Sequence, residues 1–292
     1  MGAGHPERPE RLGAIQDQLI AAGLFEHLKR FEAPLASPAQ LLRVHTAAYL
    51  AQIRRAAPSQ GLTYLDPDTA MNPGTLEAAL RAAGSVVLGT DLVMAREVEN
   101  AFCSVRPPGH HATRSHAMGF CIFNNVAVGA AHAIHAHGLQ RVAIADFDVH
   151  HGNGTEDIFR DEARVMLLST FQHPFYPYSG AQTGNEHLIP VPLPAGTAGT
   201  EFREAVADRW LPALEAFRPE MLFICAGFDG HREDDMASFG LVEADYAWVT
   251  ERLKDIALRH AQGRIVSSLE GGYALGALGR SAAAHIKVLA GL

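Results

Sequence analysis

The sequence predicts an α/β fold in which a mostly parallel sheet is covered by helices on both faces. Five short, almost continuous apolar runs have the character of strands buried on both faces, and they lie at 101–105, 142–147, 165–169, 221–225 and 265–269. Longer segments with helical character alternate with them, at 73–96, 124–137, 201–217, 243–260 and 275–289. This alternation is typical of parallel strands joined by crossover helices.

The remaining segments fit one domain that spans residues 1–292. Residues 9–57 are expected to form mainly helix and loop, and the proline-rich stretch 174–194 a long ordered loop near the functional site. No linker, internal repeat or low-complexity tract divides the chain. A single large α/β domain is therefore expected.

Composition narrows the class of protein. Hydrophobic residues make up 48% of the chain and charged residues 19%, which is enough apolar material for a substantial core. The net charge of -8 argues against a nucleic-acid binder. Three cysteines, Cys103, Cys121 and Cys225, are too few and of odd number for a disulfide framework. Neither an apolar signal core nor a membrane-length apolar run is present, so we expect a cytoplasmic protein with no membrane partner.

Polar side chains gather where the second predicted strand ends. Asp146, Asp148 and His150 alternate after the apolar run 142–145, and side chains two apart on a strand share a face. Asp229 follows the fourth predicted strand, whose carboxyl end lies at the same edge of a parallel sheet. Taken one at a time, each of these residues is typical of a helix cap or a turn. Together Asp148, His150 and Asp229 predict a catalytic zinc site, with two carboxylates, one imidazole and an open position for water.

A histidine pair follows the first central strand. His110 and His111 could be buried hydrogen-bonding residues, but imidazoles titrate near neutrality and suit proton transfer at a metal site. Adjacent histidines point in different directions, so we expect two roles. Asp146 and Asn153 are the candidate orienting partners. Proton-transfer catalysis is the preferred interpretation.

Aromatic residues near the strand ends carry a weaker signal. Tyr273 follows the glycine pair after the fifth strand, where it is either a turn aromatic or a phenol donor to a developing oxyanion. Phe120 and Tyr176 are either ordinary loop aromatics or walls of a substrate tunnel. His132, His135 and His137 lie on one predicted helix, away from the strand ends, and are expected to pack or face solvent.

Several motifs in order resemble the histone deacetylase family, in the branch that holds class II enzymes, bacterial deacetylase-like amidohydrolases and acetylpolyamine amidohydrolases. The motifs lie at 5–9 (HPERP), 106–111 (RPPGHH), 119–125 (GFCIFNN), 146–154 (DFDVHHGNG), 226–229 (AGFD) and 270–273 (EGGY). They run from His5 almost to the end of the chain.

The resemblance implies the arginase/deacetylase fold, a three-layer α/β/α sandwich with a mostly parallel, eight-stranded sheet. The segment before His5 is much shorter than the family's usual start, which carries the first strand. That edge strand can therefore be absent here. Phe171 stands where the family usually has a histidine, and Asn153 stands where class I members have aspartate.

The resemblance also implies a role for each matching residue. It implies zinc ligands at Asp148, His150 and Asp229. It implies a catalytic group of His110, His111, Tyr273, Asp146 and Asn153. It implies a monovalent-cation site, expected to hold K⁺, formed by Asp146, Asp148, His150, Ser169 and Thr170. It implies a substrate tunnel lined by Gly119, Phe120, Tyr176, Met236, Gly271 and Gly272.

The implied activity is zinc-dependent removal of acetyl or short acyl groups from an amine by metal-activated water. The substrate would be an acylated amine, either acetyl-lysine in a protein or a small acetylpolyamine. The acidic stretch Glu233-Asp234-Asp235 is either a tunnel rim that favours a cationic substrate or a solvated loop. Zinc against iron as the metal, and homo-oligomer formation, stay open.

Two rival functions stand beside this one. A ureohydrolase shares the architecture but holds two manganese ions and needs an Asp-X-His-X-Asp strand end, whereas the order here is Asp-X-Asp-X-His. A non-catalytic acyl-amine binding protein would be expected to lose a ligand, a histidine or Tyr273, and none is lost. Metal stoichiometry tests the first rival and turnover the second.

Overall fold

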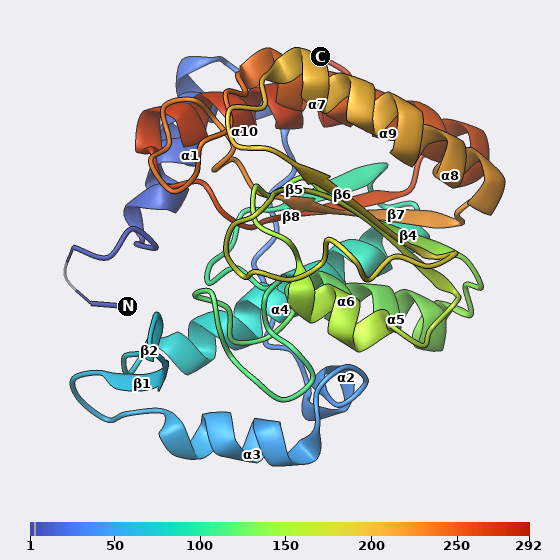
Figure 1. Cartoon of the computed structure of the whole chain (residues 1–292). Coiled ribbons are helices and arrows are strands. Elements are labelled where there is room, and N and C mark those ends of the chain that lie inside the picture. The colour runs from blue at the N-terminus through green and yellow to red at the C-terminus, as the bar shows by residue number, and fades with distance from the viewer. Residues whose placement is uncertain (3) are drawn as a thin grey trace.

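A computed structural model describes residues 1–2 and 4–292 and shows three layers, with a central sheet between two layers of helices (Figure 1). Six parallel strands form the sheet in the spatial order β3-β8-β7-β4-β5-β6. Their bounds are β3 (Asn100–Cys103), β4 (Val142–Asp146), β5 (Val165–Gln172), β6 (Leu188–Leu193), β7 (Met221–Ala226) and β8 (Ile265–Leu269).

Helices cover both faces of this sheet (Figure 1). One face carries α1 (Glu10–Ala21), α7 (Gly199–Ala205), the π-helical turn η2 (Val206–Trp210), α8 (Leu211–Phe217), α9 (Glu243–His260) and α10 (Leu275–Ala290). The other carries α4 (Thr75–Met94), α5 (Asn125–His137) and α6 (Asn153–Phe159). Outside these layers lie η1 (Phe25–His27), α2 (Pro38–Leu41), α3 (Ala47–Ala56) and a separate hairpin of β1 (Thr63–Asp66) and β2 (Thr69–Met71).

The sheet has a hydrophobic core on each of its faces, because side chains alternate between the two faces along each buried strand. Val142 and Ile144 of β4 belong to the core shared with α4 and α5, whereas Ala143 and Ala145 belong to the core shared with α9 and α10. All five residues of β4 are buried. The strand therefore has apolar residues on both faces, and its first polar side chain, Asp146, appears only where the strand ends.

The order of the strands creates a crevice at the carboxyl end of β4. The chain passes from β4 to β5 and β6 on one side, and later returns to place β7 on the other side of β4. In open α/β sheets, ligands bind at such a switch point, outside the carboxyl ends of the strands. The fold thus positions the residues that follow β4 and β7 next to one another.

Local signals define the helix ends that matter for this arrangement. The side chain of Asn124 accepts a hydrogen bond from the backbone of Ala127 at the start of α5, and Gly138 ends that helix in the left-handed conformation, at φ 72°. In α9, Asp245 accepts from the backbone N–H of Val242. These caps explain why the predicted helices 124–137 and 243–260 agree with the structure within one residue.

The predicted parallel α/β architecture is confirmed, whereas the eight-stranded sheet is wrong. The main sheet has six strands, and the other two form the separate β1–β2 hairpin. The predicted loop 174–194 is wrong in its last part, which forms β6 at the sheet edge. Pro190 and Pro192 obscure this strand in the sequence, because proline fits only the edge of a sheet. The short helix α6 was not predicted either.

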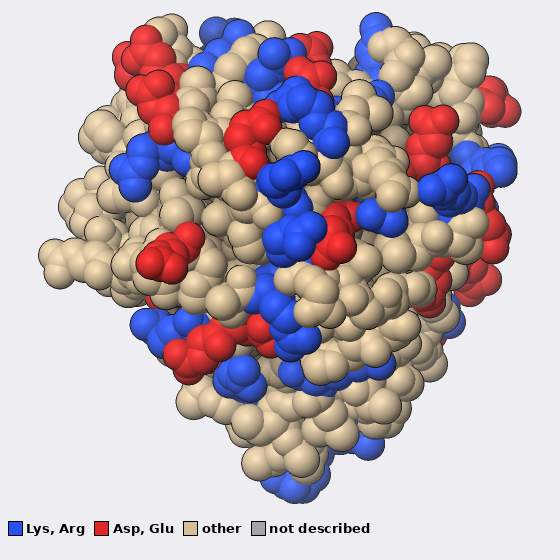
Figure 2. Space-filling view, turned by 90° about the vertical axis from the view of Figure 1, so that its right-hand side faces the viewer, with Lys and Arg blue, Asp and Glu red and all other residues tan. Residues whose placement is uncertain are grey.

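The cysteines, the surface charges and the helices can be compared with what the composition predicted. All three cysteines are buried and free. Figure 2 shows Lys and Arg spread over one face of the molecule, with Asp and Glu interleaved among them. Among the described residues, no helix combines the length and apolar character that a membrane crossing requires. The expectation that the protein does not bind nucleic acid stays a prediction.

Substitution of Gly84 by alanine tests how the N-terminal segment docks on α4. An added Cβ would overlap the carbonyl oxygen of Pro34 and lie 2.8 Å from the nitrogen of Ala36, so Gly84→Ala should destabilise the protein by about 1–3 kcal/mol. Gly13, an exposed glycine in α1 with no atom near the added Cβ, is the matched control. Gly13→Ala should stabilise by roughly 0.5–1 kcal/mol. Urea unfolding midpoints that move in the same direction for both variants would contradict this packing.

Candidate metal and catalytic site

The polar residues that follow β4 and β7 meet in one buried cluster. Asp148, His150 and Asp229 are each buried, and each offers a ligand atom within 4.8 Å of the others. The Nδ1 atom of His150 lies 3.1 Å from Asp148 Oδ1 and 3.2 Å from Asp229 Oδ2. The structure thus brings together the three predicted metal ligands, from two strand ends about 80 residues apart in the chain.

The charges of this cluster are out of balance without a cation. Burial lowers the pKa of His150, but the hydrogen bonds and charges of Asp148 and Asp229 outweigh it and raise that pKa to about 10. Burial and the nearby charge of Asp148 raise the pKa of Asp229 to about 6. With His150 protonated, two buried carboxylates beside one imidazolium still carry an excess of negative charge, and a divalent ion that takes the place of the imidazole proton offsets their desolvation.

The donor set fits a zinc ion. Apart from its ion-pair contact with His150 Nδ1, the buried Oδ2 of Asp229 has no hydrogen-bond partner among the described residues, so this oxygen is free to act as a ligand. Imidazole nitrogen and carboxylate oxygen are ligands that zinc accepts, and three protein ligands leave a position for water or substrate. The chemistry of the cluster is therefore that of a catalytic metal site.

Two glycines allow the carboxylates to lie this close to the backbone. Gly271, which follows β8, donates its N–H to Asp148 Oδ2 at 2.8 Å. An added Cβ at Gly271 would overlap Asp229, and one at Gly227 would overlap Asp148. Glycine at both positions is therefore a requirement of the metal cluster rather than of a turn.

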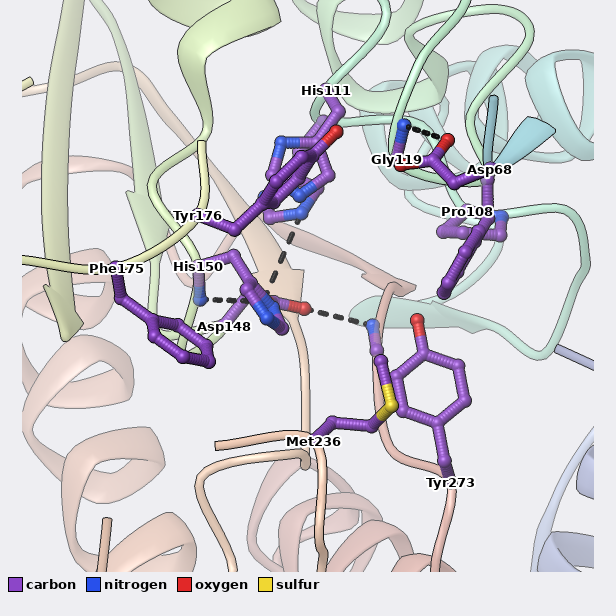
Figure 3. Close-up of a pocket in the computed structure, with 13 residues that line it drawn as sticks. Asp68, Pro108, His111, Gly119, Asp148, His150, Phe175, Tyr176, Met236 and Tyr273 are labelled. Atoms are coloured by element: carbon purple, nitrogen blue, oxygen red, sulfur yellow. Dashed lines mark hydrogen bonds and ion pairs between the residues drawn. The ribbon is translucent and has the colours of Figure 1, made fainter. Parts of the chain in front are cut away.

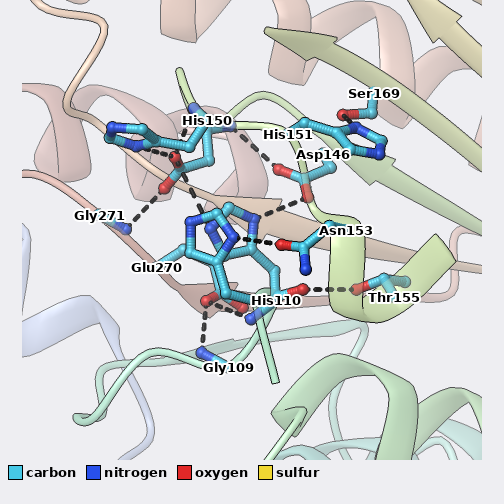
Figure 4. Close-up of polar contacts among 12 residues, drawn as sticks. Gly109, His110, Asp146, His150, His151, Asn153, Thr155, Ser169, Glu270 and Gly271 are labelled. Atoms are coloured by element: carbon cyan, nitrogen blue, oxygen red, sulfur yellow. Dashed lines mark hydrogen bonds and ion pairs between the residues drawn. The ribbon is translucent and has the colours of Figure 1, made fainter. Parts of the chain in front are cut away.

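The two adjacent histidines have different partners (Figure 4). His110 Nδ1 lies 3.0 Å from Asp146 Oδ2, and His111 Nδ1 lies 2.7 Å from Asn153 Oδ1. The orienting partners expected from the sequence are thus in hydrogen-bond contact with the two rings. Both imidazoles are buried, and their centroids are 4.0 Å apart.

Burial and neighbouring charges separate the pKa values of the two histidines. Burial lowers the pKa of His110, but the negative charges of Asp148, Asp146 and Glu270 outweigh it and raise that pKa well above its usual value. Burial, together with the positive charges of His110 and His150, lowers the pKa of His111 well below its usual value. One imidazole is therefore held protonated and the other neutral at neutral pH.

Glu270 supports the histidine pair from the end of β8. Its Oε2 accepts hydrogen bonds from the backbone of Gly109 at 2.6 Å and of His110 at 3.1 Å. Burial raises the pKa of this carboxyl to about 7. The sequence placed Glu270 at a strand end without giving it a role, and its only signal was an acidic residue directly after a buried strand.

Tyr273 is positioned by two buried charged residues. The guanidinium of Arg11 lies 4.8 Å from the centre of the Tyr273 ring and donates to the carbonyl oxygens of Gly272 and Glu270. Asp234 accepts from the backbone N–H groups of Tyr273 and of Ala274. Neither role was foreseen, because Arg11 lies 261 residues from Gly272 in the chain.

Only part of the predicted acidic rim, residues 233–235, is exposed to solvent and free of ion pairs in the described structure. Asp234 is buried under the Tyr273 loop, and Glu233 pairs with Arg280 at 2.7 Å. Only Asp235 stays exposed without an ion pair among the described residues. The interpretation of 233–235 as a patch that attracts cationic substrates loses most of its support.

A cavity of about 200 Å³ opens above the metal cluster (Figure 3). Of the predicted tunnel residues, five line it: Gly119, Phe120, Tyr176, Met236 and Gly271. Gly272 is buried but does not line the cavity, because it turns away at φ 117° to pack against Phe228. Tyr273 lies across the cavity from Tyr176.

Three further lining residues were missed, namely Asp68, Pro108 and Phe175. Asp68 comes from the unpredicted β1–β2 hairpin and accepts the N–H of Gly119 at 3.0 Å. Phe120 adopts a positive φ of 66° and packs edge-on against Tyr273. The hairpin thus fixes the backbone that carries Phe120, and no local sequence signal pointed to this contact.

The residues expected to hold a monovalent cation include two members of the metal cluster, Asp148 and His150, and three residues of β4 and β5. Asp146 and Ser169 are opposite each other in β4 and β5. Thr170 Oγ1 is buried without a hydrogen-bond partner among the described residues. Occupancy of this site by K⁺ stays a prediction.

A second group of potential ligands, Asp91, His132 and His137, lies on α4 and α5 away from the cavity. Nε2 of each histidine lies 2.7 Å from Asp91 Oδ1, and Arg43 lies 2.7 Å from Nδ1 of His132. Because arginine only donates, His132 must carry its proton on Nε2. The group is thus satisfied as a hydrogen-bond network that joins the two helices, in agreement with the packing role expected for His132 and His137.

Comparison with known proteins places this site in a family. Residues 5–289 match the histone deacetylase domain. The chain is 39% identical over 278 residues to a histone deacetylase-like amidohydrolase of Pseudomonas aeruginosa, covering 93% of this chain and 73% of that protein. It is 36% identical over 296 residues to a probable deacetylase of Archaeoglobus fulgidus, covering 98% of this chain and 82% of that protein.

A solved structure agrees with the fold. The crystal structure of the HDA15 HD domain matches all of this chain and 85% of its own, with a TM-score of 0.93 and 36% sequence identity. The sequence match, the shared fold and the buried cluster at the carboxyl ends of β4 and β7 agree with one another. The chain therefore belongs to the histone deacetylase family.

Proposed function

We propose that the protein is a zinc-dependent hydrolase that removes acetyl or short acyl groups from an amine. The observation that carries this proposal is the narrow cavity of about 200 Å³, whose floor combines three potential metal ligands with a histidine pair of opposite pKa shifts. Membership of a family of deacetylases and amidohydrolases supports the same class of reaction. A zinc ion bound by Asp148, His150 and Asp229 would polarise the amide carbonyl and lower the pKa of water.

His111 is suited to act as the general base. Its Nδ1 faces the amide oxygen of Asn153, which accepts a hydrogen bond, so the proton is held on Nδ1 and Nε2 is left with a free lone pair. Because its pKa is lowered by burial and by neighbouring positive charge, the imidazole is neutral at pH 7. It can therefore take a proton from a water molecule in the cavity and return it to the leaving amine.

His110 and Tyr273 are suited to stabilise the negative charge that develops on the carbonyl oxygen. His110 is held as an imidazolium by Asp146, and burial raises the pKa of Tyr273 well above its usual value, so the phenol keeps its proton. A preorganised donor of this kind costs no reorganisation during the reaction. The roles of the two histidines thus differ, although they are neighbours in the chain.

The cavity sets the class of substrate. Its aromatic walls, Phe120, Phe175 and Tyr176, suit a slender aliphatic chain, with the acyl group at the metal cluster and the amine toward the mouth. Acetyl-lysine side chains and acetylpolyamines both have this shape. We further propose that K⁺ binds near Asp146 and Thr170, and that the protein acts in the cytoplasm.

A release assay with metal analysis tests the function. The zinc-loaded protein should release acetate from an acetyl-lysine peptide or an acetylpolyamine and contain one zinc per chain at the cluster. Asp148→Ala should lose that ion, because the remaining pair leaves too few ligands for tight binding. Two ions per cluster would favour the ureohydrolase rival, and absence of turnover with zinc bound would favour a non-catalytic binding protein.

Tyr273→Phe should lower kcat by about 10²–10³ while zinc content stays that of the unsubstituted protein. The substitution removes only the hydroxyl that would donate to the oxyanion. Tyr178→Phe is the matched control, since Tyr178 is 77% exposed, and it should leave kcat unchanged. If Tyr273→Phe kept full turnover, the donor role of this hydroxyl would be refuted.

Asn153→Asp should shift the acid limb of the pH profile of kcat/KM to higher pH by about 1–2 units. A carboxylate beside Nδ1 favours the protonated imidazole and so raises the pKa of His111. The general base is then lost at a higher pH as the solution is acidified. An unchanged acid limb, measured with steady-state rates between pH 5 and 9, would show that His111 is not the base.

A further inference from the structure

One wall of the cavity belongs to a long loop, residues 173–187, which connects β5 to β6. Phe175 and Tyr176 of this loop line the cavity (Figure 3). The Phe175 ring stacks on His150 with centroids 5.6 Å apart, and the Tyr176 ring meets His111 edge-on at 5.3 Å. The position of this loop therefore decides how wide the cavity is beside the metal cluster.

The middle of the loop, residues 174–184, has one hydrogen bond to the rest of the described chain, whereas His173 and His187 at its two ends bond to neighbouring segments. Thr183 Oγ1 donates a hydrogen bond to Glu156 Oε2 at 2.6 Å. In the part of the chain that the structure describes, this is the only hydrogen bond that joins residues 174–184 to another segment. A second hydrogen bond of Thr183, to the carbonyl of Gly180, lies within the loop itself.

Glu156 is held in place as a buried carboxylate on α6. His151 Nε2 lies 2.8 Å from Glu156 Oε2, and Arg160 donates to Oε1 at 3.1 Å. Burial raises the pKa of Glu156, but the hydrogen bonds from His151 and Thr183 outweigh it, so the pKa is lowered. The carboxylate is thus ionised at neutral pH, and hydrogen bonds to an ionised acceptor are about twice as strong as neutral ones.

The loop also rests on the ring of His151. That ring is 1% exposed and lies between the Phe171 ring, at 4.5 Å between centroids, and the backbone of Gly180. A Cβ at Gly180 would lie 2.5 Å from the imidazole, and the residue has a φ of 93°. Phe171 therefore supports the loop through an apolar contact with the His151 ring.

We propose that the Glu156–Thr183 hydrogen bond is a clamp that sets the position of the Phe175–Tyr176 wall and thereby the length of acyl chain that the cavity accepts. This inference rests on the proposed hydrolase function. Thr183 and Glu156 touch neither the metal cluster nor the cavity, so they are positioning residues. The clamp acts because a loop with so few hydrogen bonds to its surroundings opens locally when its tether is removed.

Release of the clamp should change selectivity more than chemistry. A retracted wall no longer encloses an acetyl group, so binding of the acetyl substrate weakens, while a longer acyl chain gains space. The metal ligands, His111 and Tyr273 are held by other contacts and keep their geometry. We therefore expect the Michaelis constant and the chain-length preference to move, and kcat for the acetyl substrate to stay nearly constant.

The test compares Thr183→Val with the unsubstituted, zinc-loaded full chain on acetyl-lysine and hexanoyl-lysine peptides. In Thr183→Val, KM for the acetyl peptide should rise about tenfold with kcat within about twofold, and the ratio of kcat/KM for hexanoyl over acetyl should rise about tenfold. Thr183→Ser keeps the hydroxyl and should behave like the unsubstituted chain. Thr200→Val, the same substitution at an exposed threonine, is the matched control.

Amide hydrogen exchange provides a readout that needs no turnover. Residues 174–184 should exchange faster in Thr183→Val, and at the original rate in Thr183→Ser and Thr200→Val. Unchanged exchange, or an unchanged hexanoyl-to-acetyl ratio in an active enzyme, would overturn the clamp. If the unsubstituted chain released neither acyl group, the hydrolase proposal would fail instead, and the exchange rates alone would then decide whether the clamp holds the loop.

Discussion

The site depends on a charge imbalance buried at the carboxyl ends of β4 and β7. Asp148 and Asp229 lie beside one imidazole, His150, with almost no access to solvent. Such a group is costly to bury unless a cation balances it. The surrounding structure brings the carboxylates closer together rather than apart, since glycines at 227 and 271 let the backbone approach them. A fold that only needed stability would not retain this arrangement, so the cluster is best understood as a binding site that the sheet is built to hold.

Proton transfer depends on a second contrast, between the partners of two neighbouring histidines. A carboxylate faces His110 and an amide faces His111, although both rings lie in the same buried environment. The charges of Asp148 and Asp146 raise the pKa of His110, whereas burial and the positive charges of His110 and His150 lower the pKa of His111. Glu270 strengthens the contrast, because it fixes the backbone of His110 and adds negative charge on the same side. The pair therefore supplies an acid and a base without any difference in residue type.

The sequence predicted the features that depend on local patterns and missed those that depend on distant contacts. Strands β4, β7 and β8 were recognisable because each is a short, almost continuous apolar run, and the polar residues that follow them mark the site. Strand β6 was missed because its two prolines are tolerated only at a sheet edge. Arg11 and Asp68 were missed for another reason. Their partners, Gly272 and Gly119, lie 261 and 51 residues away, and no periodicity records such pairings.

The groups that would carry the chemistry and those that would select the substrate are held in different ways. The metal cluster and the histidine pair follow strands of the sheet, and backbone N–H groups from two segments, 148–150 and Gly271, bond to the carboxylates of Asp146 and Asp148. By contrast, the wall formed by Phe175 and Tyr176 lies in the stretch 174–184, which one hydrogen bond joins to another segment of the described chain. The loop touches His150 and His111 only through its aromatic rings, whereas the strand ends are fixed by hydrogen bonds of their own, so we expect the reacting groups to stay in place when the loop shifts. Selectivity in this protein can therefore change through residues such as Thr183, far from the metal cluster, while the reacting groups keep their geometry.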